Sequence, residues 1–155
     1  MRRILIVDDE EQIRSLLVDF FKMLNYETVV ASNGTEALAI INQNDIDCII
    51  SDLIMPDMDG IELLKQIRSR GKKTPFIIIT GYPTVDSAIE AIKEGAYDYV
   101  SKPLKLNEVR FKVERILHVK TLERSNKRLT GVAWAFLISI PIWLVLGIIF
   151  GKLWW

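Results

Sequence analysis

The chain has 155 residues, enough for one ordinary domain and a shorter additional segment. Its 20 basic and 20 acidic residues give a formal net charge of +0 at pH 7, so no overall field favours nucleic acid as a partner. The single cysteine, Cys48, excludes an internal disulfide, and it lies in an apolar run where a buried, inert thiol is expected.

Five short apolar runs bounded by polar residues predict buried β-strands. They span residues 3–8, 27–31, 46–52, 75–80 and 97–101. Between them, apolar residues at spacings of three and four predict amphipathic helices. These helices span residues 11–24, 34–43, 60–70 and 84–94, and a fifth begins after Pro103, near Leu106. Strands that alternate with helices through short connections imply an α/β fold with a doubly wound, five-stranded parallel sheet.

The C-terminal part of the chain has a different composition. Residues 132–151 contain no ionisable side chain, and a helix of that length spans roughly 30 Å, the thickness of the hydrocarbon core of a bilayer. Basic residues at 124, 127 and 128 precede this run, and Lys152 and Trp154–Trp155 follow it, as is typical of the two ends of a membrane span. A buried core helix is the alternative, but so small a domain has no interior for a uniformly apolar helix.

We therefore expect four parts: a globular domain over 1–120, a basic linker or helical extension over 121–131, a transmembrane helix over 132–151 and a short tail over 152–155. A coiled coil in the linker is disfavoured by its polar seam positions. The basic flank predicts a single-pass protein of the cytoplasmic membrane whose globular domain faces the cytoplasm. Gly147 and Gly151 form a small-xxx-small pair, which leaves homodimerisation through the span as an alternative.

The residues at the ends of the predicted strands are the candidate functional residues. Asp8-Asp9 follow the first strand and Asp52 ends the third, while Thr80 and Lys102 come at the ends of the fourth and fifth. Ligands of open α/β sheets bind in the crevice at the carboxyl ends of the strands. Three acids, a hydroxyl and an amine are therefore expected to converge on one edge of the sheet.

This set of groups suits phosphoryl transfer to a side chain. Clustered carboxylates are costly without a cation, and their hard oxygens favour Mg²⁺, which Asp8, Asp9 and Asp52 could hold. Asp52 could then act as the nucleophile that becomes an acyl phosphate. Lys102 would pair with one phosphoryl oxygen, and the Thr80 hydroxyl would donate to another. The alternative for Asp8-Asp9 alone is a simple helix cap before residues 11–24.

The same residues lie in motifs that resemble the receiver domain of bacterial response regulators, the phosphoacceptor module of two-component signalling. The resemblance covers about residues 2–120. Its motifs are Ile-Leu-Ile-Val-Asp-Asp-Glu at 4–10, Ser-Asp-Leu-Ile-Met-Pro-Asp-Met-Asp-Gly at 51–60, Ile-Ile-Thr-Gly at 78–81 and Ala-Tyr-Asp-Tyr-Val-Ser-Lys-Pro-Leu at 96–104. It implies a flavodoxin-like fold and phosphorylation of Asp52 by a sensor histidine kinase or a phosphotransfer protein.

The resemblance also implies details of the site. Asp9 and Asp52 would bind Mg²⁺ directly and Asp8 through water, and the backbone carbonyl of Ile54 would be a further ligand. The Lys102–Pro103 peptide would be cis. Thr80 would form a switch pair with Tyr99: on phosphorylation the hydroxyl would move toward the phosphoryl group and the tyrosine ring would turn inward. The face made by the fourth helix, fifth strand and fifth helix would change with them.

The sequence thus predicts a membrane-anchored phosphoacceptor rather than an enzyme that turns over a separate substrate. Its output would pass through an unknown partner protein, because no nucleic-acid-binding segment is expected. A phosphorylation-independent membrane scaffold is the alternative. A metal-dependent phosphohydrolase ranks lower, because Ile54 stands where enzymes of the haloacid dehalogenase type carry an acid. Apolar Ile54 also predicts a long-lived acyl phosphate.

Overall fold

The computed structural model of the chain describes residues 1–119. The predicted linker and the predicted span over 132–151 lie outside the described residues. Within residues 1–119, no helix is long and apolar enough to cross a membrane. The chain divides into two compact units, Met1–Leu117 and His118–Trp155, and the first contains the sheet.

The first unit is built on a parallel sheet of five strands, as predicted. The strands are β1 (Arg3–Val7), β2 (Glu27–Ala31), β3 (Cys48–Asp52), β4 (Phe76–Thr80) and β5 (Asp98–Ser101), in the order β2-β1-β3-β4-β5. The helices between them are α1 (Glu11–Met23), α2 (Gly34–Gln43), α3 (Gly60–Ser69) and α4 (Val85–Lys93), and residues 106–119 form a further helix. The predicted elements are confirmed, with shifts of one or two residues at their ends.

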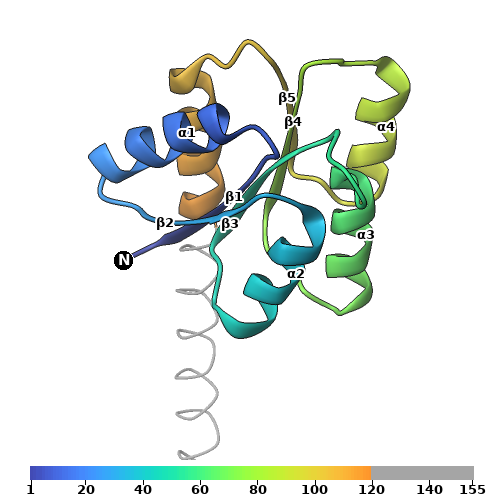
Figure 1. Ribbon diagram of the computed structural model, residues 1–155, viewed down its shortest axis with the longest axis horizontal. Coiled ribbons are helices and arrows are strands. Elements are labelled where there is room, and N and C mark those ends of the chain that lie inside the picture. Colours follow the sequence, from blue (N-terminus) through green and yellow to red (C-terminus); the bar gives the residue numbers. More distant parts are fainter. Residues whose placement is uncertain (120–155) are drawn as a thin grey trace, which may run out of the picture. The chain divides into compact units, whose positions relative to one another are not determined.

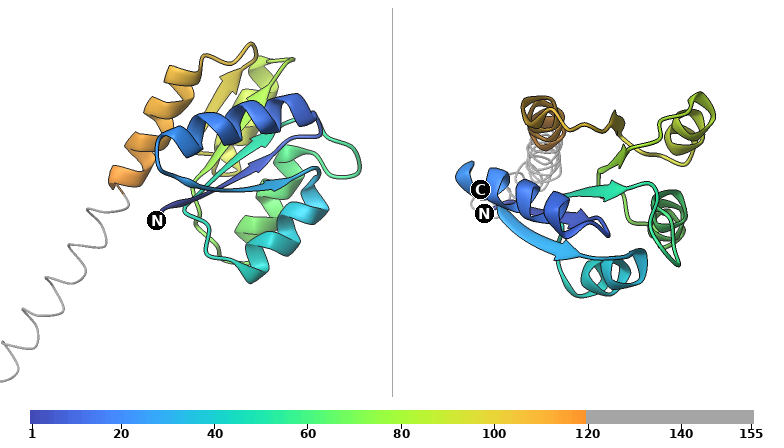
Figure 2. Two further views of the ribbon diagram at one scale, coloured as in Figure 1. Left: turned by 60° about the vertical axis from the view of Figure 1, so that its left-hand side comes forward. Right: turned by 45° about the horizontal axis from the view of Figure 1, so that its top comes forward.

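Helices cover both faces of the sheet (Figures 1 and 2), which confirms the doubly wound arrangement. Successive side chains along each strand point to opposite faces of the sheet and pack into two separate cores. On one face Ile4 and Ile50 pack with α1 and the helix over 106–119, and on the other Leu5 and Ile49 pack with α2 and α3. Because β3 and β4 are buried along their whole length, their ends are held rigidly at the edge of the sheet.

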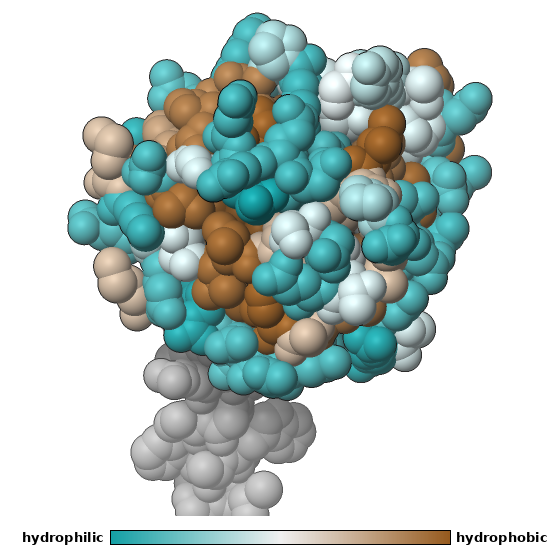
Figure 3. All heavy atoms as spheres, viewed as in Figure 1, coloured by the Kyte–Doolittle hydropathy of each residue, from teal (hydrophilic) through white to brown (hydrophobic). Residues whose placement is uncertain are grey.

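The surface is mixed, with apolar side chains scattered among hydrophilic ones on the face shown in Figure 3. The largest fully buried side chains, such as Phe21 and Phe76, lie in the two cores. The first unit therefore has the interior of an ordinary α/β domain.

Candidate functional site

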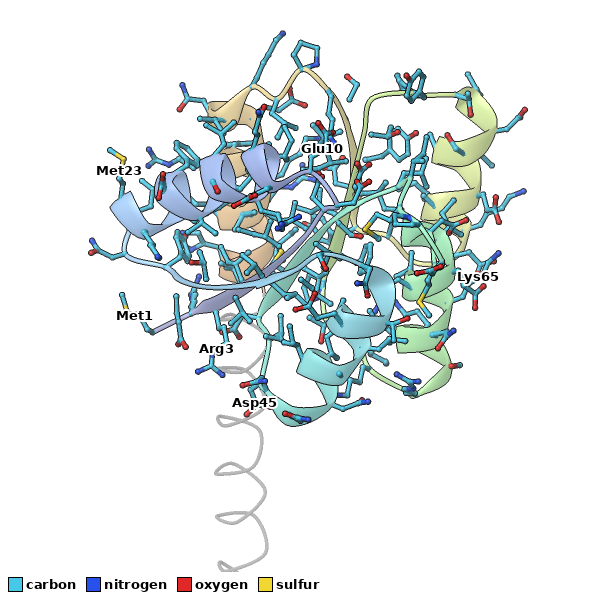
Figure 4. All side chains as sticks on the ribbon, in the orientation of Figure 1. Met1, Arg3, Glu10, Met23, Asp45 and Lys65 are labelled. Carbon is cyan, nitrogen blue, oxygen red and sulfur yellow. The ribbon has the colours of Figure 1, made fainter. Side chains whose placement is uncertain are left out.

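The polar residues predicted to converge do lie together, at the carboxyl end of the sheet. Asp8 follows β1, Asp52 ends β3, Thr80 ends β4 and Lys102 follows β5. Asp8, Asp52 and Thr80 are buried, with exposed fractions of 2%, 6% and 0%. In Figure 4, Glu10 marks this edge of the sheet, across the sheet from Met1 and Arg3 at the start of β1. Buried polar groups at the ends of several strands indicate a functional site.

Lys102 is the centre of the charge network. Its ammonium donates to Asp52 Oδ2 at 2.8 Å and to Glu10 Oε1 at 3.0 Å, and it lies 3.1 Å from Asp8 Oδ2. Burial by itself would lower the pKa of Lys102, but the hydrogen bonds to these three carboxylates outweigh it and raise that pKa above its ordinary value. Lys102 therefore stays a cation that bridges three acids.

One lysine does not fully compensate this negative charge. Burial raises the pKa of the Asp8 carboxyl, and the nearby Asp52 charge adds to the rise against the opposing hydrogen bonds from the Glu10 backbone N–H and Lys102. Carboxylate oxygens of Asp8, Glu10 and Asp52 all lie within 4.8 Å of one another. Two buried carboxylates and an exposed one, all hard oxygen donors with excess negative charge, fit a divalent cation of the Mg²⁺ type.

The structure places Asp9 differently from Asp8. The Asp9 side chain is exposed and is not one of the three carboxylates that lie together, although it lines the same pocket. Its backbone carbonyl accepts a hydrogen bond from Arg14 at 2.9 Å. The direct Mg²⁺ contact of Asp9 stays a prediction.

Glu10 was not singled out from the sequence. It follows two acids and directly precedes α1 as its N-cap residue, so its carboxylate is typical of an ordinary acid at a helix N-terminus. The structure instead directs it to Lys102, 92 residues further along the chain. The available signal was the run of four acids, Asp8 to Glu11, directly after β1.

A pocket of about 250 Å³ opens at this cluster. Its lining is formed by Asp9, Glu10, Asp52, Ile54, Gly81, Tyr82 and Lys102. The Asp52 carboxylate is held on both sides, because the Ile54 backbone N–H donates to Oδ1 at 3.3 Å and Lys102 donates to Oδ2. The pocket therefore opens onto a carboxylate whose two oxygens are both fixed.

The loop after β3 packs tightly against the backbone of Asp52. A Cβ on Gly60 would come within 2.3 Å of the Asp52 carbonyl oxygen, so only glycine allows this approach. The Gly60 N–H donates to the Leu53 carbonyl at 2.8 Å and fixes the return of the chain into α3. On the other side of the site, the Lys102–Pro103 peptide is cis, as the resemblance implied.

Thr80 and Tyr99 lie on the same face of the sheet. In the β4–β5 register Ile78 pairs with Tyr99 and Thr80 pairs with Ser101, so alternation places all four side chains on one side. Val100 packs in the opposite core. The Thr80 hydroxyl accepts from the Tyr82 backbone N–H at 3.1 Å. The Tyr99 hydroxyl lies 2.8 Å from Ser87 Oγ of α4, which the sequence did not predict.

Comparison with known proteins identifies the family to which this fold belongs. Residues 4–114 match the family model of the response regulator receiver domain, and the chain belongs to that family. It is 40% identical over 144 residues to the regulatory protein AtoC of Escherichia coli, covering 90% of this chain and 31% of AtoC. It is 40% identical over 127 residues to the transcriptional regulatory protein SrrA of Staphylococcus aureus, covering 82% of this chain and 50% of SrrA.

Solved structures show the same likeness. A receiver domain protein from Clostridium thermocellum superposes with a TM-score of 0.74 at 32% identity, covering 79% of this chain and 98% of that one. The response regulator TrrA of Thermotoga maritima, solved in complex with Mg²⁺ and BeF, gives a TM-score of 0.69 at 36% identity, covering 76% of this chain and 100% of that one. The chain is thus a receiver of the two-component type, and receivers of this family take phosphoryl groups from histidine kinases and bind Mg²⁺ at an acidic pocket.

Proposed function

We propose that Asp52 is the phosphoacceptor of this receiver, and that a sensor histidine kinase or phosphotransfer protein is the donor. The observation that supports this most directly is the position of Lys102, which lines the pocket and whose ammonium contacts both Asp52 and Asp8. A fixed cation beside a fixed carboxylate is what an incoming phosphoryl group requires, since its transfer depends mainly on positioning and charge neutralisation.

The described residues suggest the roles in the transfer. An Asp52 carboxylate oxygen attacks phosphorus while the bond from phosphorus to the donor nitrogen breaks. Lys102 pairs with one phosphoryl oxygen, and Thr80 exchanges its contact with the Tyr82 N–H for a hydrogen bond donated to another. Asp8, Asp52 and Glu10 would hold Mg²⁺, with Asp9 and the Ile54 carbonyl as the further ligands that the resemblance implies. When bound, the ion neutralises charge on the phosphoryl oxygens.

We further propose that the receiver is anchored to the cytoplasmic membrane by residues 132–151. The support is the sequence: an uncharged apolar run of bilayer length with basic residues before it and tryptophans after it. The receiver would act through protein contacts, without turning over a separate substrate, and a homodimer through the span is an alternative. The output partner is not identified by AtoC or SrrA, because the chain spans only 31% and 50% of these relatives.

The phosphoacceptor is tested in the full chain with Mg²⁺ and acetyl phosphate, using intact mass as the measurement. The wild type should gain the mass of one phosphoryl group, and Asp52→Asn should not. Asp57→Asn is a matched control, because Asp57 is an exposed acid in the same loop with φ 66°, a conformation that asparagine tolerates. Full phosphorylation of Asp52→Asn would refute the assignment. An unchanged cellular phenotype of Asp52→Asn would instead favour the scaffold.

A further inference from the structure

The hydroxyl of Tyr99 is bound to the first turn of α4. Its oxygen lies 2.8 Å from Ser87 Oγ, and the ring packs beside the core that contains Ile78 and Ala91. Tyr99 belongs to β5 and Ser87 to α4, so this hydrogen bond joins the edge strand of the sheet to a helix.

Ser87 is itself held firmly. It is the N3 residue of a capping box in which its N–H donates to Thr84 Oγ1 at 3.1 Å and the Thr84 N–H donates to Ser87 Oγ at 3.3 Å. The Ser87 hydroxyl also bonds to the Thr84 carbonyl at 3.0 Å. These contacts fix the serine side chain independently of Tyr99. The hydrogen bond to Tyr99 therefore costs little further side-chain entropy of Ser87.

The position of α4 is also linked to the pocket. The loop from Thr80 to Thr84 joins the end of β4 to the capping box, and its Gly81 and Tyr82 line the pocket beside Asp52. Thr80 and Tyr99 share a face of the sheet two residues apart in the register. Movement of Thr80 toward Asp52 would therefore vacate space on the face where the Tyr99 ring packs.

From this arrangement we propose that Ser87 is a positioning residue of the switch: its hydroxyl holds the Tyr99 ring against the N-terminus of α4 while the Thr80 hydroxyl is bound to the Tyr82 N–H, and so favours the unphosphorylated state. The inference rests on the proposed function, in which phosphorylation draws Thr80 inward and the ring follows. Ser87 and the phosphoryl group then favour opposite positions of one side chain. By linkage, loss of the Ser87 hydroxyl raises the affinity of the pocket for a phosphoryl mimic.

The test uses the full chain in a mild detergent, with beryllofluoride as the mimic at fixed Mg²⁺. The chain has four tyrosines, so labelled tyrosine rings give few signals in NMR, and the spectrum of Tyr99→Phe assigns the Tyr99 signal. Ser87→Ala should shift the Tyr99 signal toward its beryllofluoride-bound position before any mimic is added. It should also tighten beryllofluoride binding by roughly 2- to 10-fold, the change in equilibrium that one net hydrogen bond produces.

Two variants separate positioning from stability. Ser87→Thr keeps the hydroxyl and should restore wild-type binding and the wild-type Tyr99 signal. Asn33→Ala removes the side-chain cap of α2 and should weaken the fold without tightening the binding of the mimic. A Ser87→Ala protein with the wild-type Tyr99 signal and wild-type affinity would overturn the role of Ser87. A wild-type chain that binds no beryllofluoride would overturn the phosphoacceptor assignment instead, while the ring signal without mimic would still report on Ser87.

Discussion

At the scale of single residues, Ile54 would lie beside a phosphoryl group on the proposed acceptor Asp52. Its side chain is 54% exposed and lines the pocket, yet it has no group that can orient or activate a water molecule. We expect the acyl phosphate of the isolated protein to persist well beyond seconds with Mg²⁺ present. Ile54→Gln, which brings an amide beside the phosphate, should shorten its lifetime several-fold.

The lifetime is measured as loss of phosphorylated mass after the donor is removed. Ile54→Leu is the matched control, because it keeps an apolar side chain of the same size and should keep the wild-type lifetime. Decay of the wild type within seconds, or equal lifetimes of the Gln and Leu variants, would show that residue 54 does not control hydrolysis.

Glu10 places a negative charge where an anionic donor must enter. Its carboxylate lies 3.0 Å from Lys102 Nζ and its side chain is 59% exposed, so water screens it strongly. A unit charge a few ångströms away in water contributes about 0.5–1 kcal/mol. We therefore expect Glu10→Gln to be phosphorylated roughly 2- to 5-fold faster by acetyl phosphate, an anionic donor, at saturating Mg²⁺.

The neighbouring acid provides the comparison. Glu11 is exposed at the start of α1, so Glu11→Gln removes the same charge one residue further along the chain. Its phosphorylation rate should stay near that of the wild type, and raised salt should reduce the gain of Glu10→Gln. Equal rates for the two variants would mean that Glu10 does not act on the donor.

At the scale of elements, the N-terminus of α2 shows how local sequence fixes a helix end. Asn33 accepts from the Glu36 N–H at 2.8 Å, and the N–H and hydroxyl of Ser32 donate to the Glu36 carboxylate at 2.7 Å and 2.8 Å. These bonds from Ser32 lower the pKa of Glu36 from its ordinary value of 4.5. Because the folded pKa is depressed, Glu36 stabilises the fold above pH 4.5, and this contribution is lost as the pH falls through the lowered pKa.

Glu36→Gln should therefore be less stable against urea than the wild type at neutral pH. The two stabilities should converge in acid. Asn33→Ala tests the same helix end without a titrating group and should cost about 1 kcal/mol at every pH. A Glu36→Gln deficit that persists unchanged into acid would show that the carboxylate charge is not what Ser32 binds.

Elements and site differ in how far the sequence predicts them. The strands were predictable because each is a short apolar run, and the convergence of Asp8, Asp52 and Lys102 followed from parallel strands ending at one edge. The contact of Glu10 with Lys102 depends on which way an exposed side chain turns after β1, which periodicity does not encode. The Ser87–Tyr99 bond likewise depends on how α4 is placed against β5.

At the scale of the whole molecule, a rigid sheet separates two helical layers, and the site lies at one end of both. The buried strands β3 and β4 hold Asp52 and Thr80 in place, while Lys102 and Tyr99 come from the edge strand β5 and the loop after it. Under the proposed function, the buried strands hold the phosphoacceptor, and the edge of the sheet holds the groups that would respond to its phosphorylation. A switch of this design needs only small movements at β5 and α4 to alter the surface.

Attachment to a membrane would restrict that surface to partners at the bilayer. Residues 132–151 should keep the wild-type chain in the membrane fraction after washing with alkaline carbonate. Ile140→Arg with Leu144→Arg places two charges near the middle of the run, at a cost of roughly 5–7 kcal/mol, and should release the protein. Leu153→Arg lies beyond the run and should not. Each variant should still be phosphorylated at Asp52, because the receiver contains its own core. If carbonate extracts the wild type, residues 132–151 are not an anchor, and the receiver acts without one.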